Sequence, residues 1–141
     1  MKISARNQLK GTVVQVEEGA VNGIVSIDIG GQVLKSDITM EAIKDLGLVA
    51  GTEAFAVIKA SNVLIAALDA PITCLSARNQ LVGTVSKAEK GAVNGLIVVD
   101  IADGVQITSS ITNEAIDALE LAAGKSAVAI IKATDVLTAV N

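Results

Sequence analysis

The hexapeptide Ser4-Ala5-Arg6-Asn7-Gln8-Leu9 occurs a second time, unchanged, as Ser76-Ala77-Arg78-Asn79-Gln80-Leu81. The second copy begins at residue 76 of 141, so each half of the chain has about 70 residues. Residues 4–31 aligned with 76–103 give 17 identities in 28 positions, and residues 38–66 aligned with 111–139 give 17 in 29. The chain is therefore a tandem duplication, with one residue inserted where Gly30-Gly31 becomes Ala102-Asp103-Gly104.

The first half shows the period-two alternation and β-branched residues that are typical of strands. A short helix is expected after Thr39, which can cap it, and Gly47 is expected to end it. The strands are predicted over residues 9–16, 24–29, 32–37, 53–59 and 62–68. This β-β-β-α-β-β order predicts a mostly β protein of two tandem OB-like five-stranded β-barrels, each with one short helix. A plain five-stranded roll is the competing architecture. Domain boundaries are predicted at 1–70 and 71–141.

Composition excludes several classes of function. A net charge of −4 and a pI near 4.7 argue against a broad basic face for nucleic acid. The chain has no His, which excludes Cys–His and Ser–His pairs and His-ligated metal sites, and its single cysteine, Cys74, fits a reducing compartment. No signal peptide or membrane span is recognisable. We predict a soluble cytoplasmic protein without enzymatic activity. Because 51% of the residues are hydrophobic, its two small halves are expected to pack together and to oligomerise.

The two copies agree on few cationic residues. Of the 11 Lys and Arg residues, only Arg6 with Arg78 and Lys59 with Lys132 occupy matching positions. A hydroxyl residue follows each of these lysines by two positions, and a serine precedes each arginine by two. These side chains are all hydrogen-bond donors, and an arginine fork beside a lysine suits the oxygens of a small anion. The pattern favours an oxyanion site that needs no metal.

Structural interpretations of the same residues stay open. The arginines can form ion pairs with carboxylates that also recur in both copies, namely Asp28, Asp100, Glu41 and Glu114. The Asn-Gln pair that follows each arginine is expected to hold the start of a strand. Thr39 and Thr112 are expected first of all to be helix caps. The loops at 19–23 and 91–95 read as turns that can also present backbone N–H groups to a second anion.

The hexapeptide, Ile-Thr before the short helix and Ile-Lys-Ala-Ser/Thr near the end of each half together resemble the molybdate-binding Mop domain. Two tandem copies resemble the di-Mop molbindins, cytoplasmic molybdate-binding proteins of bacteria. This resemblance implies an OB-like barrel whose domains assemble in sixes, so that a two-domain chain forms a homotrimer. It implies that molybdate or tungstate lies between domains, held by the hexapeptide of one and the Lys-Ala-Ser/Thr segment of another.

Carried onto this chain, the resemblance assigns anion binding to fourteen residues, with no cofactor and no metal other than the molybdenum of the oxyanion. In the first copy they are Ser4, Ala5, Arg6, Lys59, Ala60 and Ser61. In the second they are Ser76, Ala77, Arg78, Lys132, Ala133 and Thr134. Thr39 and Thr112 are added as further donors. Related proteins fuse this domain to a DNA-binding helix-turn-helix or a transport ATPase, and this chain has room for neither. We therefore expect storage and homeostasis of molybdate.

Three other classes of function remain as alternatives to anion storage. An OB-fold module for single-stranded nucleic acid needs aromatic stacking platforms and a basic groove, whereas Phe55 is the only aromatic residue of this chain. An enzyme can use a lysine beside a serine as base and nucleophile, but no paired carboxylates or cofactor loop accompany them here. A purely structural assembly protein is the third reading, and it predicts no ligand.

Overall fold

The computed structural model describes all residues from 1 to 141 and confirms the mostly β fold class and the predicted element order. The first half contains β1 (Asn7–Glu18), β2 (Asn22–Asp28), β3 (Val33–Thr39), α1 (Met40–Asp45), β4 (Glu53–Ile58), a 3₁₀ turn η1 (Ala60–Asn62) and β5 (Leu64–Ala66). The second contains β6 (Asn79–Lys90), β7 (Asn94–Ala102), β8 (Val105–Thr112), α2 (Asn113–Ala118), β9 (Ser126–Ile131), η2 (Ala133–Asp135) and β10 (Leu137–Ala139).

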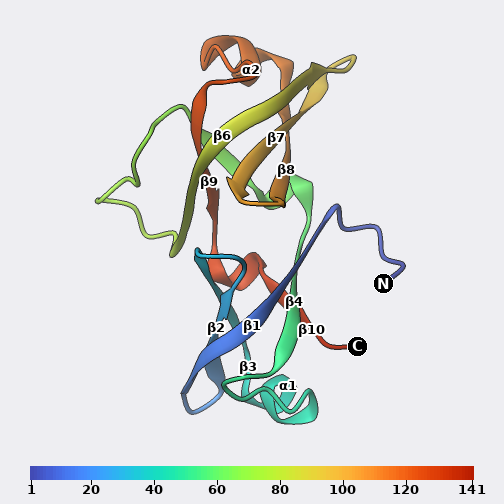
Figure 1. Cartoon of the computed structure of the whole chain (residues 1–141), viewed down its shortest axis with the longest axis vertical. Helices are drawn as coiled ribbons and strands as arrows, with labels where there is room; N and C mark the ends of the chain where they lie inside the picture. The colour runs from blue at the N-terminus through green and yellow to red at the C-terminus, as the bar shows by residue number, and fades with distance from the viewer.

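The two short helices lie at opposite ends of an elongated molecule (Figure 1). Thr39 caps α1, since its Oγ1 accepts a hydrogen bond from the backbone N–H of Ala42 at 3.1 Å. Thr112 caps α2 in the same way, with Ala115 as the donor at 3.1 Å. Both threonines thus have the predicted capping role. None of the helices has the length and apolar character needed to cross a membrane.

Each sheet is completed by a strand from the other half of the chain. The strand orders are β10-β4-β1-β2-β3 and β5-β9-β6-β7-β8. Leu137 of β10 pairs with Val57 of β4, and Leu64 of β5 pairs with Ile130 of β9. The strand predicted over residues 62–68 is shorter in the structure, where β5 covers only Leu64–Ala66. The turn η1 before β5, and η2 before β10, carry the chain across to the other sheet. The boundary at residue 70 therefore marks the repeat in the sequence, while each sheet draws on both sides of it.

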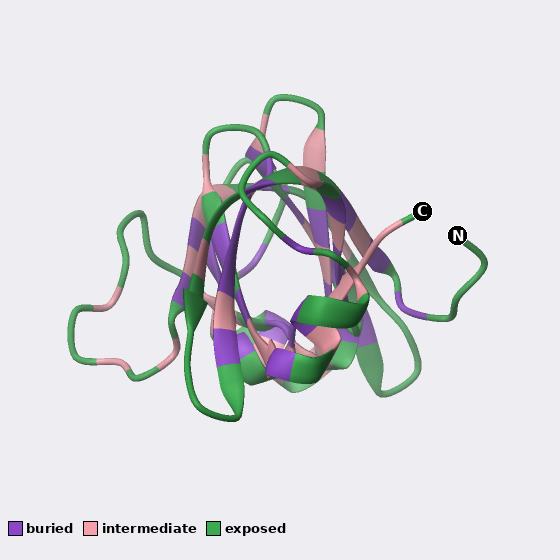
Figure 2. Ribbon diagram, turned by 90° about the horizontal axis from the view of Figure 1, so that it is seen from below, coloured by how far each residue is buried: buried purple, intermediate pink, exposed green.

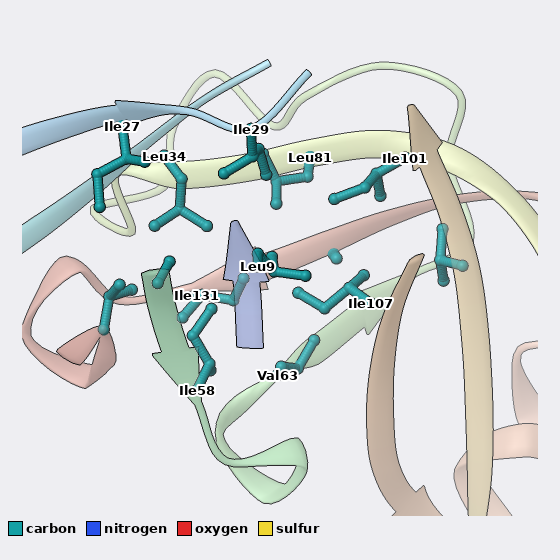
Figure 3. Packing of buried hydrophobic residues seen from close by; sticks show 14 of the residues in the cluster. Leu9, Ile27, Ile29, Leu34, Ile58, Val63, Leu81, Ile101, Ile107 and Ile131 are labelled. Carbon is teal, nitrogen blue, oxygen red and sulfur yellow. The ribbon is translucent and has the colours of Figure 1, made fainter. Parts of the chain in front are cut away.

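The exchange joins the two halves around a shared core. One cluster of 25 buried residues takes members from both halves. In Figure 3, Leu9 and Ile58 of the first half lie beside Ile107 and Ile131 of the second. The strands are curved, and buried residues alternate along them with exposed and partly buried ones (Figure 2). Ser36 links edge strand β3 to the β10 segment, because its Oγ donates to the carbonyl of Val136 at 2.7 Å.

Removal of residues 137–141 will destabilise the sheet that contains β4 more than the other sheet, because β4 then loses β10, one of its two hydrogen-bonded neighbours. We expect a loss of about 1–3 kcal/mol, as a few net backbone hydrogen bonds disappear. Hydrogen exchange measured by mass spectrometry should show faster exchange in residues 53–58, with residues 126–131 still protected. The deletion of Asn141 alone is the control. Equal loss of protection in both segments would contradict the exchanged topology.

Asp28 at the β2–β3 hairpin provides a test by pH. Its carboxylate accepts hydrogen bonds from the backbone N–H groups of Gly31 at 2.8 Å and Gly30 at 3.0 Å. These bonds lower the pKa of Asp28 below its ordinary value of 3.8. The contribution to stability is therefore present above the unfolded pKa and is lost as the pH falls through the lower folded pKa. An NMR titration should give an Asp28 midpoint below 3.8; a midpoint at or above that value would contradict these bonds.

Candidate oxyanion site

The arginine of each hexapeptide folds back on its own backbone. The Nε of Arg78 donates to the carbonyl of Ser76 at 3.0 Å, and its Nη2 donates to the carbonyl of Leu75 at 3.0 Å. Arg6 repeats this with Ser4 at 2.9 Å and Ile3 at 3.3 Å. A guanidinium has five N–H donors, so these bonds fix the loop and leave other donors of the exposed fork for a ligand.

The structure does not contain the arginine–carboxylate pairs that the sequence left open. Its ion pairs join Lys10 with Glu53, Lys87 with Glu89, and Lys90 with Asp117. All six of those residues are exposed, and neither arginine takes part. The recurrence of arginine is thus not explained by an internal ion pair.

The asparagine that follows each arginine anchors the hexapeptide to the other sheet. Asn79 is buried, accepts from the backbone N–H of Lys35 at 2.7 Å and donates to the carbonyl of Lys35 at 2.8 Å. Asn7 makes the matching pair of bonds with Thr108, at 2.7 and 2.8 Å. The structural role predicted for these asparagines is confirmed.

The strand register brings the hexapeptide of each copy next to the lysine of the Lys-Ala-Ser/Thr segment. Asn79 lies opposite Ile131 in the β6–β9 ladder, so Arg78 and Lys132 occupy adjacent positions just beyond its end. Asn7 lies opposite Ile58 in the β1–β4 ladder, which places Arg6 and Lys59 in the same relation. The two predicted segments thus meet within the same copy, whereas the resemblance implied that they come from different domains.

A pocket of about 210 Å³ gathers the second set of predicted residues. Its lining consists of Ser76, Ala77, Arg78, Lys132, Ala133, Thr134 and one residue of the first half, Asp37 in β3. Arg78, Lys132 and Thr134 are exposed at its rim, whereas Ala133 is buried against the protein. The pocket therefore lies where η2 and the second hexapeptide meet a strand of the other sheet, and each of its polar lining side chains except that of Asp37 has a hydrogen-bond donor.

The first copy has the same local construction. Ala60 and Ala133 are equally buried, each at 8% exposure, and each begins a 3₁₀ turn directly after the lysine. Only a small residue fits at that point, because η1 packs against β8 and η2 packs against β3. Ser61, like Thr134, is exposed. The six predicted residues of each copy thus share one arrangement.

Three of the features predicted to bind an anion lie outside this pocket. Thr39 and Thr112 do not line the pocket, and their hydroxyl oxygens serve as helix caps. The loop at 19–23 contributes to a separate pocket, whose lining includes Glu17, Glu18 and Asp37. Three carboxylates disfavour the second anion considered there. The sequence also missed Asp37, because its counterpart in the second half is a different residue type.

The fold and this pocket define a tandem pair of five-stranded β units with a pocket lined by cationic and hydroxyl side chains and one carboxylate. The family model of the TOBE domain matches residues 3–65 and again residues 75–138, so the chain belongs to the TOBE domain family. Phe55, the sole aromatic residue, is only partly exposed. The sheets therefore offer no aromatic platform for stacked bases, and the nucleic-acid alternative is not favoured.

Proteins that are similar to this chain transport or bind molybdenum compounds. The chain is 44% identical over 142 residues to the molybdenum transport protein ModE of Herbaspirillum seropedicae, covering 100% of the chain and 52% of that protein. It is 41% identical over 140 residues to the molybdenum-pterin-binding protein MopA of Rhodobacter capsulatus, covering 99% and 52%. The chain thus spans about half the length of these curated relatives. A solved structure of the cytoplasmic molybdate-binding protein ModG with molybdate bound matches with a TM-score of 0.94 and 46% identity over 100% of both chains.

Replacement of Asn79 by Ala should destabilise the protein by about 1–3 kcal/mol, because the backbone N–H and C=O of Lys35 lose their partner in a part-buried place. Asn7→Ala should have an effect of the same size, since Asn7 makes the matching bonds. Urea unfolding measures both changes. Gln106→Ala, which removes an exposed bond to Asp100, is the control. A loss no greater than that of the control would contradict the anchoring role.

Proposed function

We propose that this chain binds molybdate, or the equally shaped tungstate, in the pocket formed by the second hexapeptide and the segment Lys132–Thr134, and in the equivalent place of the first copy. The pocket carries this proposal, because Arg78, Lys132 and two hydroxyl side chains converge on a space of about 210 Å³. The proposed binding residues are the twelve hexapeptide and Lys-Ala-Ser/Thr residues that share this arrangement, without the two capping threonines.

The chemistry of the lining suits a tetrahedral dianion. Each oxygen of such an anion accepts hydrogen bonds, and charge-assisted bonds from guanidinium and ammonium groups are the strongest that a side chain can supply. The arginine fork spans two oxygens, while lysine supplies a compact charge. The local cluster of cations thus attracts an anion although the whole chain has a net charge of −4. The similarity to ModG with molybdate bound supports the choice of anion.

We further propose a homo-oligomer, in the form of the trimer expected for a di-Mop molbindin, that stores molybdate in the cytoplasm without enzymatic activity. Exposed apolar residues recur at matching positions in the two copies, as a repeated interface requires. Val21 and Val93 are 74% and 73% exposed, and Leu64 and Leu137 are 60% and 58% exposed. In this assembly the halves 1–70 and 71–141 act as two repeats of one binding unit.

Titration calorimetry of the anion-free protein with sodium molybdate tests the proposed site. Wild type should give saturable heat, with much weaker heat from sulfate and phosphate. Arg78→Ala and Lys132→Ala should each weaken binding at the affected sites by tenfold or more, on the order of one lost charge-assisted hydrogen bond.

Lys87→Ala is the matched control, because Lys87 is an exposed lysine paired with Glu89 away from the pocket. It should bind molybdate like wild type. No heat with molybdate from a folded wild-type protein would refute the proposed function. Equal losses in Lys87→Ala and Lys132→Ala would show that only the overall charge matters.

A further inference from the structure

The two proposed anion sites differ in charge at one position of their lining, whereas the change from Ser61 to Thr134 keeps the hydroxyl group. Asp37 of β3 lines the second-copy site, formed by 76–78 and 132–134. Ile24 lies opposite Asp37 in the β2–β3 ladder, and Leu96 lies opposite Ser110 in the β7–β8 ladder. Since Ile24 and Leu96 are equivalent in the repeat, Ser110 is the counterpart of Asp37.

Neighbouring hydrogen bonds show that Ser110 lies beside the first-copy site, formed by 4–6 and 59–61. Ser36 precedes Asp37 and donates to the carbonyl of Val136, directly after η2, at 2.7 Å. Ser109 precedes Ser110 and donates to the carbonyl of Val63, directly after η1, at 2.5 Å. β8 therefore passes the first-copy site in the register in which β3 passes the second.

The bonds one residue earlier fix the same register. Asn79 holds both backbone groups of Lys35, two residues before Asp37. Asn7 holds both backbone groups of Thr108, two residues before Ser110. Each strand is thus held at the serine that precedes the differing residue and at the residue before that serine, so the two positions correspond in space as well as in sequence.

The difference between Asp37 and Ser110 changes the charge of the lining. The Asp37 carboxylate accepts a hydrogen bond from the side chain of Asn22 at 3.0 Å, and it forms no ion pair with Arg78 or Lys132. Its negative charge is therefore not neutralised by a direct partner and acts on an anion in the pocket. Ser110 is neutral, and its hydroxyl can donate a hydrogen bond to such an anion.

We propose that Asp37 makes the anion sites of the chain unequal, so that the second-copy site binds a dianion more weakly than the first-copy site does. This inference rests on the proposed function. Repulsion between the carboxylate and a dianion at close range, in surroundings partly screened by solvent, is the physical cause. The first-copy sites fill at lower molybdate concentration, and the second-copy sites widen the concentration range over which the protein takes up the anion.

The test uses the full-length chain with one class of site disabled. Lys59→Ala leaves the second-copy site, and Asp37→Asn is then added, because asparagine keeps an oxygen for Asn22 but carries no charge. Calorimetry with sodium molybdate should show tightening on the order of tenfold. Asp45→Asn, which removes an exposed carboxylate at the end of helix α1 that does not line the pocket, is the control and should leave the affinity unchanged.

The reciprocal change completes the design. In a Lys132→Ala background, which leaves the first-copy site, Ser110→Asp should weaken molybdate binding by a similar factor. Unchanged or weaker binding on Asp37→Asn, in a protein whose wild type binds molybdate, would overturn this inference and leave the proposed function intact. A wild type that binds no molybdate would instead overturn the proposed function. Asp37→Ser serves as a second neutral variant if Asp37→Asn does not fold.

Discussion

Two buried asparagine side chains form the contact on which the rest of the structure depends. The side-chain amide of Asn7 or Asn79 binds both the N–H and the C=O of a single residue in the other sheet, as the backbone of a neighbouring strand would. Buried backbone groups need such partners, and leaving them unpaired is costly. The same side chains fix the first residues of β1 and β6, so they also position Arg6 and Arg78, which directly precede those strands.

Strand exchange makes the two halves interdependent. A unit of about 70 residues has little core of its own, and its apolar surface is large relative to its volume. By sending β5 and β10 into the opposite sheets, the chain buries residues of both halves in one cluster. The 3₁₀ turns that redirect the chain at this crossing also contain the hydroxyl residues, and each turn directly follows one of the lysines. The crossing that stabilises the fold therefore builds the site as well.

Much of the site followed from the duplication. Positions that have the same role in both copies keep the same residue type. This criterion identified Arg6 with Arg78 and Lys59 with Lys132. Comparing the two copies of the repeat cannot detect a lining residue that differs between them. Asp37 was discarded for this reason, although it lines the pocket. Thr39 and Thr112 were over-counted, because a residue kept for helix capping is indistinguishable in sequence from one kept for a ligand.

The sequence by itself determined the local elements, because β-branched alternation, a threonine cap and glycine stops act within a few residues of each other. It also determined the tandem repeat and the residue types of the site. Only the tertiary structure decided which sheet receives β5 and β10, and which residues of the other half face each site. Those choices depend on contacts between residues about 40 to 100 positions apart, such as Asn79 with Lys35 and Asn7 with Thr108. No short-range pattern records them.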